Sequence, residues 1–299
     1  MNDFEFLLFD RIEKIKQVNK KYDLEHNAYI SFSGGKDSTV LHYLIDLALP
    51  NNKIPRVFIN TGIEYQDIRK FVQELAKNDN RIIVLNSGVN IKKMLEKEGY
   101  PFKSKEHSLK IEQYKKGSIS KNIVDYRYKE NFGCPKILQY QYEDDFKLHI
   151  SDKCCYKLKK EVAHKWQRDN NKSITITGML KEEHGQRTSI TCIVTDTKGN
   201  VNKFHPLSVV TKEFEDEFIK RNNIQLCKLY YPPFNYKRTG CKGCPFSLDL
   251  QEQLDIMERL LPNEKKQCEI LWKPVYDEYR RIGYRLKKYK QLNIFDIIE

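Results

Sequence analysis

The sequence contains no apolar run that approaches the roughly 20 residues needed to span a bilayer as a helix. Its start, from Met1 to Glu5, carries acidic residues where a secretory signal peptide has a basic region followed by an apolar stretch. Internal repeats and low-complexity linkers are also missing. These absences argue against a membrane protein, a secreted protein and a repeat array, and we expect a cytoplasmic globular protein.

Cysteine is too sparse for a small disulfide scaffold, since the chain has 8 cysteines among 299 residues. In a reducing compartment, clustered cysteines more often bind metal or carry out redox chemistry. Two groups are close in sequence: the adjacent pair Cys154 and Cys155, and the Cys-x-x-Cys formed by Cys241 and Cys244.

Acidic residues are outnumbered, 41 against 53 basic ones, which leaves a formal net charge of +12. This balance suits an anionic partner such as a nucleotide, a sulfated or phosphorylated metabolite, or a nucleic acid. A lysine-rich surface that serves only solubility explains the same number, so both interpretations stay open.

The first two thirds of the chain alternate short apolar strands with helical stretches. This alternation predicts an α/β fold with a parallel sheet and helices on both of its faces. We expect a nucleotide-binding domain over 1–200, with a polar insertion at about 100–150, and a smaller segment over 201–299 packed on it. The expected strands lie at 28–32, 56–60, 81–85 and 174–178, and the expected helices at 7–20, 39–49, 65–77, 91–98, 135–146 and 153–168.

A glycine pair stands between the first expected strand and the helix that follows it, in the segment Ser33-Gly34-Gly35-Lys36-Asp37-Ser38. Glycines let the backbone turn tightly and bring N–H groups close to a ligand. A helix N-terminus attracts phosphate, and the hydroxyls of Ser33 and Ser38 and the ammonium of Lys36 add donors. Asp37 can hold Mg²⁺ or cap the helix. The segment therefore predicts a phosphate site, without the spacing of a Walker A loop.

This segment resembles the loop of the PP-loop superfamily of adenine-nucleotide α-hydrolases, which includes ATP pyrophosphatases, tRNA thiolases and phosphoadenosine phosphosulfate reductases. Asn60-Thr61-Gly62 resembles the Asp-Thr-Gly of the reductase branch, with Asn60 in place of the aspartate. Thr61 and Gly62 end a strand, where open α/β sheets bind ligands. The resemblance implies that both contact the nucleotide.

The stretch from Gly178 to Arg187 resembles the Gly-x-Arg-x-x-Glu-Ser-x-x-Arg signature of that branch. Gly178, Glu183 and Arg187 match, whereas Leu180 replaces the first arginine and His184 the serine. The resemblance implies that Gly178, Glu183 and Arg187 bind the nucleotide, with Lys36, Asp37 and Arg187 as catalytic residues. Arginine suits this role because its guanidinium binds phosphate or sulfate in a bidentate manner.

A Cys-Cys pair far upstream of a Cys-x-x-Cys resembles the [4Fe-4S] pattern of assimilatory adenylylsulfate reductases. It implies that Cys154, Cys155, Cys241 and Cys244 are the metal ligands, since a cubane cluster takes four thiolates. Zinc is the alternative, although adjacent cysteines rarely share one tetrahedral ion, and free thiols are a third possibility. The reductases also carry a nucleophilic cysteine near the C-terminus, whereas no cysteine follows Cys268 here.

Three functions follow from this resemblance. The first is adenylation-linked sulfur transfer with ATP, Mg²⁺ and a [4Fe-4S] cluster, which could act on tRNA or DNA with a sulfur-donor protein. The second is reduction of adenylyl sulfate or its 3′-phosphate with an external thiol reductant. The third is a non-catalytic nucleotide-binding accessory protein.

Overall fold

The computed structural model describes residues 2–129, 133–180 and 191–288. The chain forms two compact units, each built from two separate stretches. The first unit combines Met1–Gly88 with Lys159–Gly240, and the second combines Val89–Leu158 with Cys241–Glu299. This grouping differs from the expected bounds of 1–200 and 201–299, because a strand that follows residue 200 pairs within the sheet of the first unit.

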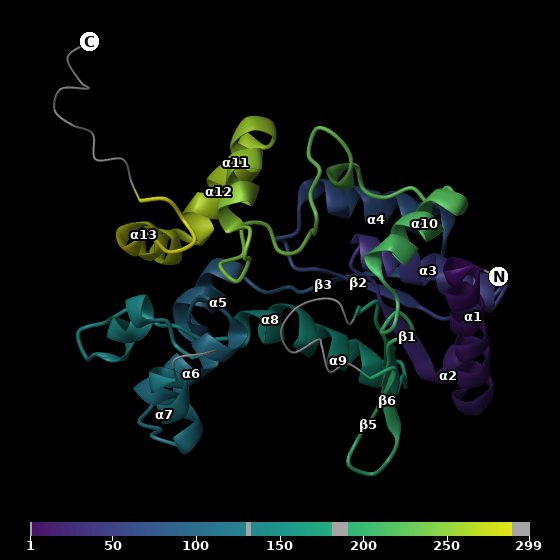
Figure 1. Cartoon of the computed structure of the whole chain (residues 1–299), viewed down its shortest axis with the longest axis horizontal. Coiled ribbons are helices and arrows are strands. Elements are labelled where there is room, and N and C mark those ends of the chain that lie inside the picture. The colour runs from purple at the N-terminus through teal and green to yellow at the C-terminus, as the bar shows by residue number, and fades with distance from the viewer. Residues whose placement is uncertain (1, 130–132, 181–190, 289–299) are drawn as a thin grey trace. The chain divides into compact units, whose positions relative to one another are not determined.

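The first unit contains a six-stranded sheet with the order β3-β2-β1-β4-β6-β5 (Figure 1). Neighbouring strands run parallel except for β5, which is antiparallel to β6 at one edge. Register is set by pairs such as Ile30 with Arg56 and Ile176 with Phe204. The strands are β1 (Ala28–Ser31), β2 (Arg56–Asn60), β3 (Ile82–Asn86), β4 (Ile174–Ile176), β5 (Ile193–Thr195) and β6 (Val201–Phe204).

Both faces of the sheet are covered. Ala28 and Ile30 are fully buried in a core that includes Leu41 and Ile45 of α3 (Lys36–Ala48). Tyr29 points to the opposite face, because side chains alternate along a strand. There its ring lies 5.3 Å from the ring of Trp166 in α9 (Glu161–Asp169). The expected fold class, a mostly parallel sheet between helices, is confirmed.

Local signals explain where the helices of the first unit begin. The first helix starts after a capping box, in which the Asn2 side chain accepts a hydrogen bond from Glu5 N at 2.9 Å and Glu5 accepts one from Asn2 N at 3.2 Å. This first helix is α1 (Asp3–Tyr22), and the side chains of Asp23 and Thr211 cap α2 (Leu24–Asn27) and α10 (Lys212–Arg221). Besides α3 and α9, the unit also contains α4 (Gln66–Asn78) and the 3-10 turn η4 (Lys228–Tyr230).

The described part of the second unit is helical. A buried core forms around Trp272, Phe102 and Tyr279, with the rings of Phe102 and Tyr279 4.5 Å apart. A π-helical turn, η2 (Tyr156–Lys160), continues from α8 toward α9, so the helix expected over 153–168 is interrupted in its hydrogen bonding. The elements are α5 (Ile91–Glu98), α6 (Lys105–Lys115), α7 (Lys121–Tyr128), η1 (Lys136–Tyr142), α8 (Lys153–Cys155), α11 (Leu250–Leu260), α12 (Pro262–Leu271) and α13 (Lys273–Ile282).

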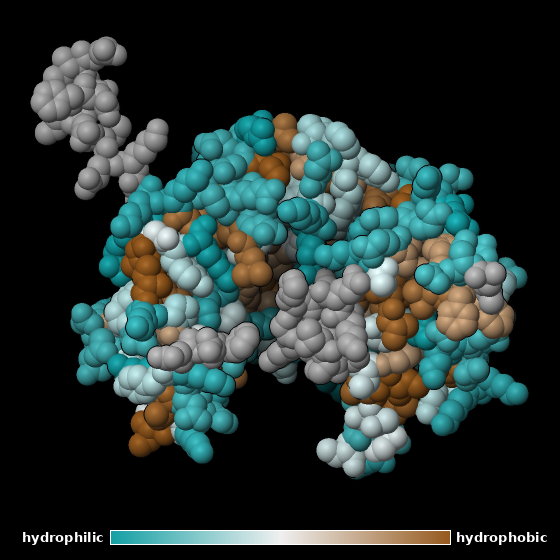
Figure 2. Space-filling view, viewed as in Figure 1, coloured by the Kyte–Doolittle hydropathy of each residue, from teal (hydrophilic) through white to brown (hydrophobic). Residues whose placement is uncertain are grey.

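The surface agrees with the charged composition. The face drawn in Figure 2 is mostly hydrophilic, with scattered hydrophobic patches. Within the described residues, no helix combines the length and the apolar character that crossing a membrane requires.

Candidate nucleotide site

The predicted phosphate loop connects β1 to α3, and Gly34 makes the turn. Its φ of +70° lies in the left-handed region, which side chains other than glycine adopt at a cost. A Cβ at this position would lie 2.6 Å from Cγ2 of Val72 and 3.2 Å from Cγ2 of Ile68. Gly34 is therefore required both by its backbone angle and by the close packing of α4 against the loop. After this turn the chain enters α3, and the N–H groups at the N-terminus of a helix attract anions.

Hydroxyl groups hold the loop in shape. Ser38 donates to the carbonyl of Gly35 at 3.0 Å and accepts from Ser33 N at 3.2 Å. Thr39, which is fully buried, donates to the same carbonyl at 2.9 Å. Ser33 Oγ lies 3.0 Å from Ser38 Oγ and 3.3 Å from Gly35 N. Ser38 thus braces the loop from within, and Ser33 is the more exposed of the two hydroxyls.

A tyrosine distant in sequence completes the loop. The hydroxyl of Tyr230 accepts a hydrogen bond from Lys36 N at 3.0 Å and lies 2.6 Å from Thr239 Oγ1. This interaction satisfies one of the free N–H groups at the start of α3. No sequence signal pointed to this contact, because Lys36 and Tyr230 are 194 positions apart.

Lys36 points to acidic residues of α10. Its Nζ lies 3.1 Å from Asp216 Oδ1 and 3.8 Å from Glu215 Oε2. Burial, together with the charge of Asp37, raises the pKa of Glu215 to about 8, although Lys36 lowers it. The charge expected to meet a phosphate is therefore partly neutralised by α10 in this structure.

Gly178 follows β4 and lies against the backbone of Asp37. A Cβ on Gly178 would be 2.7 Å from the Asp37 carbonyl oxygen. Gly178 therefore permits β4 and the start of α3 to approach closely. Next to it, Thr177 Oγ1 lies 2.6 Å from Nδ1 of His205, so the ends of β4 and β6 are joined by their side chains.

Thr61 and Gly62 lie at the end of β2, as predicted, but their polar groups are already engaged. The carboxylate of Glu64 accepts from Thr61 N at 2.9 Å and from the Thr61 hydroxyl at 2.7 Å. Lys159 lies 3.5 Å from the same carboxylate, and Asn60 Oδ1 accepts from Gly62 N at 3.2 Å. Thr61 is buried, so Gly62 is the member of the pair that solvent reaches.

A cleft opens beside the loop at the carboxyl ends of β1 and β2. Its walls are formed by apolar side chains and by the charged pair of Glu64 and Lys159, next to Ser33 of the loop. The apolar residues include Phe32, Phe58, Ile59 and Ile68. Ligands of open α/β sheets bind at this end of the strands, so the cleft and the loop form one candidate site within the first unit.

The remaining predicted nucleotide ligands, Glu183 and Arg187, lie outside the described residues, as does His184. Their proposed contacts stay predictions. Leu180, which replaces the first arginine of the signature, is 2% exposed and belongs to the hydrophobic core.

The four cysteines predicted to bind metal all belong to the second unit. Cys154 and Cys155 lie on α8, and Cys244 N donates to the Cys241 carbonyl at 3.2 Å in a tight turn. All four are free of disulfide bonds. In the described part of the chain, no three of these thiols lie within 4.8 Å of one another. One zinc ion would bring its thiolates to about 4 Å, because Zn–S bonds are about 2.3 Å long.

Trp272, between α12 and α13, and Tyr276 of α13 hold the turn that carries Cys241 and Cys244. Trp272 Nε1 donates to the Lys242 carbonyl at 3.2 Å, and the Tyr276 hydroxyl donates to the Gly243 carbonyl. Gly243 has a φ of +59°, and a Cβ there would lie 2.8 Å from Cys268 Sγ. The turn is therefore fixed by packing as well as by hydrogen bonds.

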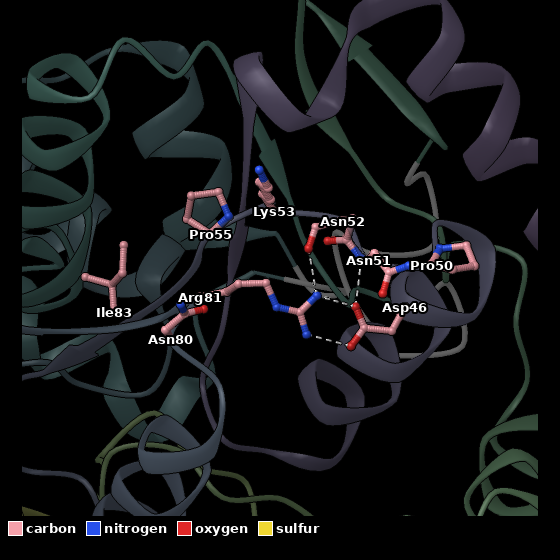
Figure 3. A pocket seen from close by; sticks show the side chains of 9 residues that line it. All are labelled: Asp46, Pro50, Asn51, Asn52, Lys53, Pro55, Asn80, Arg81 and Ile83. Carbon is pink, nitrogen blue, oxygen red and sulfur yellow. Dashed lines mark hydrogen bonds and ion pairs between the residues drawn. The ribbon is translucent and has the colours of Figure 1, made fainter.

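A second group of ionisable residues lies at the other end of the sheet, around Asp46 near the end of α3. Figure 3 shows Arg81 directed at the Asp46 carboxylate, with contacts of 2.7 and 2.9 Å, beside an open depression. Arg56, which is fully buried, contacts the same carboxylate at 2.6 Å.

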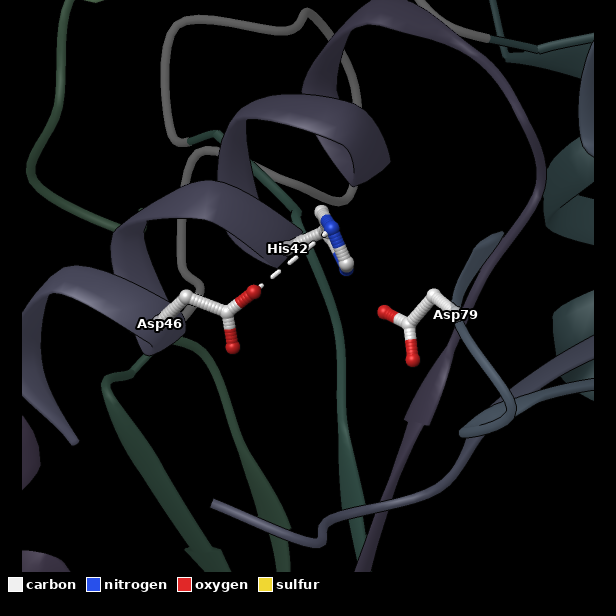
Figure 4. A group of neighbouring side chains, drawn as sticks. All are labelled: His42, Asp46 and Asp79. Carbon is white, nitrogen blue, oxygen red and sulfur yellow. Dashed lines mark ion pairs between the residues drawn. The ribbon is translucent and has the colours of Figure 1, made fainter. Parts of the chain in front are cut away.

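Figure 4 shows His42 and Asp79 next to Asp46. Three potential ligand atoms of these residues lie within 4.8 Å of one another. However, Arg81 also contacts Asp79 at 2.7 Å, so both carboxylates are already bound by arginine. Two arginines would repel a cation, and we therefore interpret the group as an ion-pair network that ties α3 to β2 and β3.

A family model described as "phosphoadenosine phosphosulfate reductase domain" matches residues 27–132 and 124–247. An uncharacterised protein of Methanocaldococcus jannaschii is 37% identical over 103 residues, which cover 31% of this chain and 25% of the relative. The chain thus matches about a quarter of that relative's length.

Solved structures with a similar course of the chain include three enzymes. A phosphoadenylyl-sulfate reductase of Candida auris has a TM-score of 0.42 at 15% identity, over 77% of this chain and 94% of that one. The FMN adenylyltransferase of Candida glabrata has a TM-score of 0.45 at 14% identity, over 77% and 60%. The NH3-dependent NAD synthetase of Campylobacter jejuni has a TM-score of 0.41 at 13% identity, over 98% and 100%.

The family match spans well over half of the 299 residues and includes both the phosphate loop and the Cys-x-x-Cys turn. The chain belongs to the phosphoadenosine phosphosulfate reductase domain family.

Proposed function

We propose that this protein is an enzyme that binds ATP at the loop Ser33–Ser38 and transfers sulfur to an adenylated acceptor. The observation that carries this proposal is the turn at Gly34, which places the N-terminus of α3 at the ligand-binding edge of a parallel sheet. The phosphates would lie against this loop, with Lys36 turning from Asp216 toward them.

The adenosine would occupy the cleft beside the loop. Phe32 and Ile59 offer apolar surface to a base, while Glu64 and Lys159 place polar groups at one side. Such a combination of apolar walls with few polar groups is typical of small-molecule sites. We assign Arg187 and Glu183 to the phosphate end of the nucleotide, as the family signature implies.

The donor set around Asp37 fits a magnesium ion, because Mg²⁺ is usually bound by one or two carboxylates together with phosphate oxygens. When bound, the ion would neutralise charge on the phosphates and favour departure of pyrophosphate. The residues of the chain contribute the rest: the loop orients the nucleotide, and Lys36 stabilises negative charge.

In the proposed reaction, an oxygen of the acceptor attacks the α-phosphorus of ATP. The bond between that phosphorus and the bridging oxygen breaks, and pyrophosphate leaves with the electron pair. A sulfur nucleophile then displaces AMP from the activated carbon or phosphorus. A tRNA or DNA acceptor is compatible with the net charge of +12.

We assign a [4Fe-4S] cluster to Cys154, Cys155, Cys241 and Cys244. Four cysteines in one unit, none of them in a disulfide bond, fit the ligand set of a cubane. Among the described residues no three of these thiols lie within 4.8 Å of one another, which argues against a single zinc ion because zinc needs its thiolates closer together. When present, the cluster would supply or hold the sulfur that is transferred.

Reduction of a sulfated adenine nucleotide is the second candidate, and the family match is the observation that favours it. The two candidates differ in their products. Pyrophosphate formed from ATP supports sulfur transfer, whereas sulfite released from adenylyl sulfate in the presence of a thiol supports reduction. Nucleotide binding without either product would support the accessory function and overturn both enzymatic proposals.

The test uses the Lys36→Ala variant, with Lys77→Ala as the matched control. Lys77 is an exposed lysine of α4 that pairs with Glu74. We expect Lys36→Ala to weaken ATP binding about tenfold or more, the loss typical of one charge-assisted contact. Lys77→Ala should bind as the wild type does. Unchanged affinity in a folded Lys36→Ala protein would contradict the assignment of the loop.

A further inference from the structure

Arg69 is a half-buried arginine of α4 whose guanidinium has no counterion. Its Nε is shielded from solvent, and it has no hydrogen-bond partner among the described residues. In the same part of the chain, its guanidinium forms no ion pair with a carboxylate. A shielded donor without a partner is costly, and a charged donor more so. The retention of Arg69 at this position therefore indicates an anionic ligand.

Two other arginines of the first unit that are shielded from solvent have a carboxylate partner. Arg56 and Arg81 contact the carboxylate of Asp46 at 2.6 and 2.7 Å. Their positive charges serve the ion-pair network that ties α3 to β2 and β3. Arg69 belongs to no such network among the described residues, so a role in the fold alone does not account for its charge.

The neighbours of Arg69 on α4 pack against the phosphate loop. A Cβ on Gly34 would lie 3.8 Å from the carbonyl oxygen of Ile68 and 2.6 Å from Cγ2 of Val72. Arg69 follows Ile68 directly, so its side chain starts beside the loop. Helical side chains lean toward the N-terminus of their helix. The N-terminus of α4 follows β2 at the edge of the sheet where the candidate nucleotide site opens, so Arg69 leans toward that edge.

Positive charges around the candidate site are mostly offset by carboxylates. Three lysines have carboxylate partners at 3.0–3.5 Å: Lys36 with Asp216, Lys159 with Glu64, and Lys228 with Asp67. The first arginine of the family signature is also missing, because Leu180 stands in its place within the hydrophobic core. Arg69 can supply the positive charge that a bound polyphosphate requires.

We propose that Arg69 binds the tetrahedral oxyanion that follows the α-phosphate of the nucleotide, which is the β- or γ-phosphate of ATP. The inference rests on the proposed function and adds a residue to which no sequence motif pointed. A guanidinium presents its N–H donors in a planar fork that matches two phosphate oxygens. Arg69 would thus hold the pyrophosphate that leaves, while the loop binds the α-phosphate. The sulfate of adenylyl sulfate has the same oxyanion chemistry, so the experiment compares both ligands.

The experiment measures binding of ATP, AMP, inorganic pyrophosphate and adenylyl sulfate to the full-length protein by isothermal titration calorimetry. In Arg69→Gln we expect the affinity for ATP and for pyrophosphate to fall about tenfold or more, and that for AMP to change less than about twofold. Arg69→Lys keeps the charge without the planar fork and should recover only part of the affinity. Lys70→Gln is the matched control, because Lys70 is the next residue of the same helix and is exposed.

Wild-type ATP affinity in a folded Arg69→Gln protein would overturn the inference. An equal loss for AMP and ATP would also overturn it, since AMP has no phosphate beyond the α-phosphate. If only adenylyl sulfate binds more weakly, the group bound by Arg69 is a sulfate and the assignment to a phosphate of ATP is wrong. If Arg69→Gln does not fold, wild-type ATP affinity in Arg69→Lys overturns the inference instead.

The same titrations separate this inference from the proposed function. If Lys36→Ala weakens ATP binding and Arg69→Gln does not, only the role of Arg69 is wrong. If pyrophosphate binding depends on Arg69 and the wild type does not bind ATP, only the nucleotide assignment is wrong. A wild-type protein that binds neither ATP nor pyrophosphate would contradict both.

Discussion

The buried histidine in the ion-pair network of α3 should make the protein sensitive to acid. His42 Nδ1 accepts a hydrogen bond from Arg56 Nε at 3.2 Å, and His42 Nε2 lies 3.6 Å from Asp46 Oδ2. The neutral ring can satisfy both contacts, whereas a protonated Nδ1 would oppose the guanidinium N–H of Arg56. Burial is the main cause that lowers the pKa of His42 to about 4 from 6.5, and the charge of Arg56 adds to it.

The sign of the effect follows from linkage. The unfolded chain binds the His42 proton near pH 6.5 and the folded chain only near pH 4, so acidification favours unfolding between these values. Over the whole interval, acidification lowers the free energy of unfolding by about 3 kcal/mol. About 2 kcal/mol of this is lost between pH 7 and pH 5. Glu215 acts in the opposite direction, because its pKa of about 8 lets acidification stabilise the folded state.

The assay compares urea unfolding of the wild type and of His42→Gln at pH 7 and pH 5. Gln keeps an acceptor for Arg56 and does not titrate. The contribution of Glu215 is common to both proteins and cancels in the difference. Between pH 7 and pH 5, the free energy of unfolding should fall by about 2 kcal/mol less in His42→Gln than in the wild type. The control is His26→Gln, at an exposed histidine of α2, which should behave as the wild type. Equal pH dependence in the wild type and His42→Gln would refute the reasoning.

Two further predictions concern the loop and the cysteines. Gly34→Ala should cost about 1–3 kcal/mol more stability than Gly88→Ala, measured by urea unfolding; both glycines have positive φ, but only at Gly34 would a Cβ meet Val72. Equal losses would show that the contact with Val72 is easily relieved. Purified without oxygen, the protein should contain about four irons and four sulfides per chain; Cys241→Ser should lose most of them and the buried Cys227→Ser none, by metal analysis. Zinc without sulfide would contradict the cluster.

The sequence was most informative where signals are local. Apolar residues followed by a glycine pair indicated β1, the loop and the start of α3, and the structure places α3 from Lys36 onward. Strands β5 (Ile193–Thr195) and β6 (Val201–Phe204) were missed, since β5 is half-exposed and Asn202 and Lys203 interrupt the apolar residues of β6. The parallel order of the sheet could be expected as a class, but the antiparallel edge could not.

Contacts between distant parts of the chain could not be predicted. Glu215 belongs to a helix rich in acidic residues, so its sequence suggests a solvent-facing position. Only the packing of α10 shows that Glu215 is buried beside Lys36, which comes 179 positions earlier in the chain. Tyr230 is a similar case, since its bond to Lys36 N depends on how η4 folds back. The assignment of Gly178 to the ligand stays a prediction. The structure adds a packing requirement against Asp37, which the residue type alone could not show.

The most direct test of the central claim is amide hydrogen exchange of the full-length protein with and without ATP. Binding at the loop predicts slower exchange in the peptide that spans Ser33–Thr39, where backbone N–H groups would meet the phosphates. It predicts no change around Asp46 and Arg81, which border the depression at the other end of the sheet. Protection confined to that depression, or ATP binding without protection of the loop, would contradict the account.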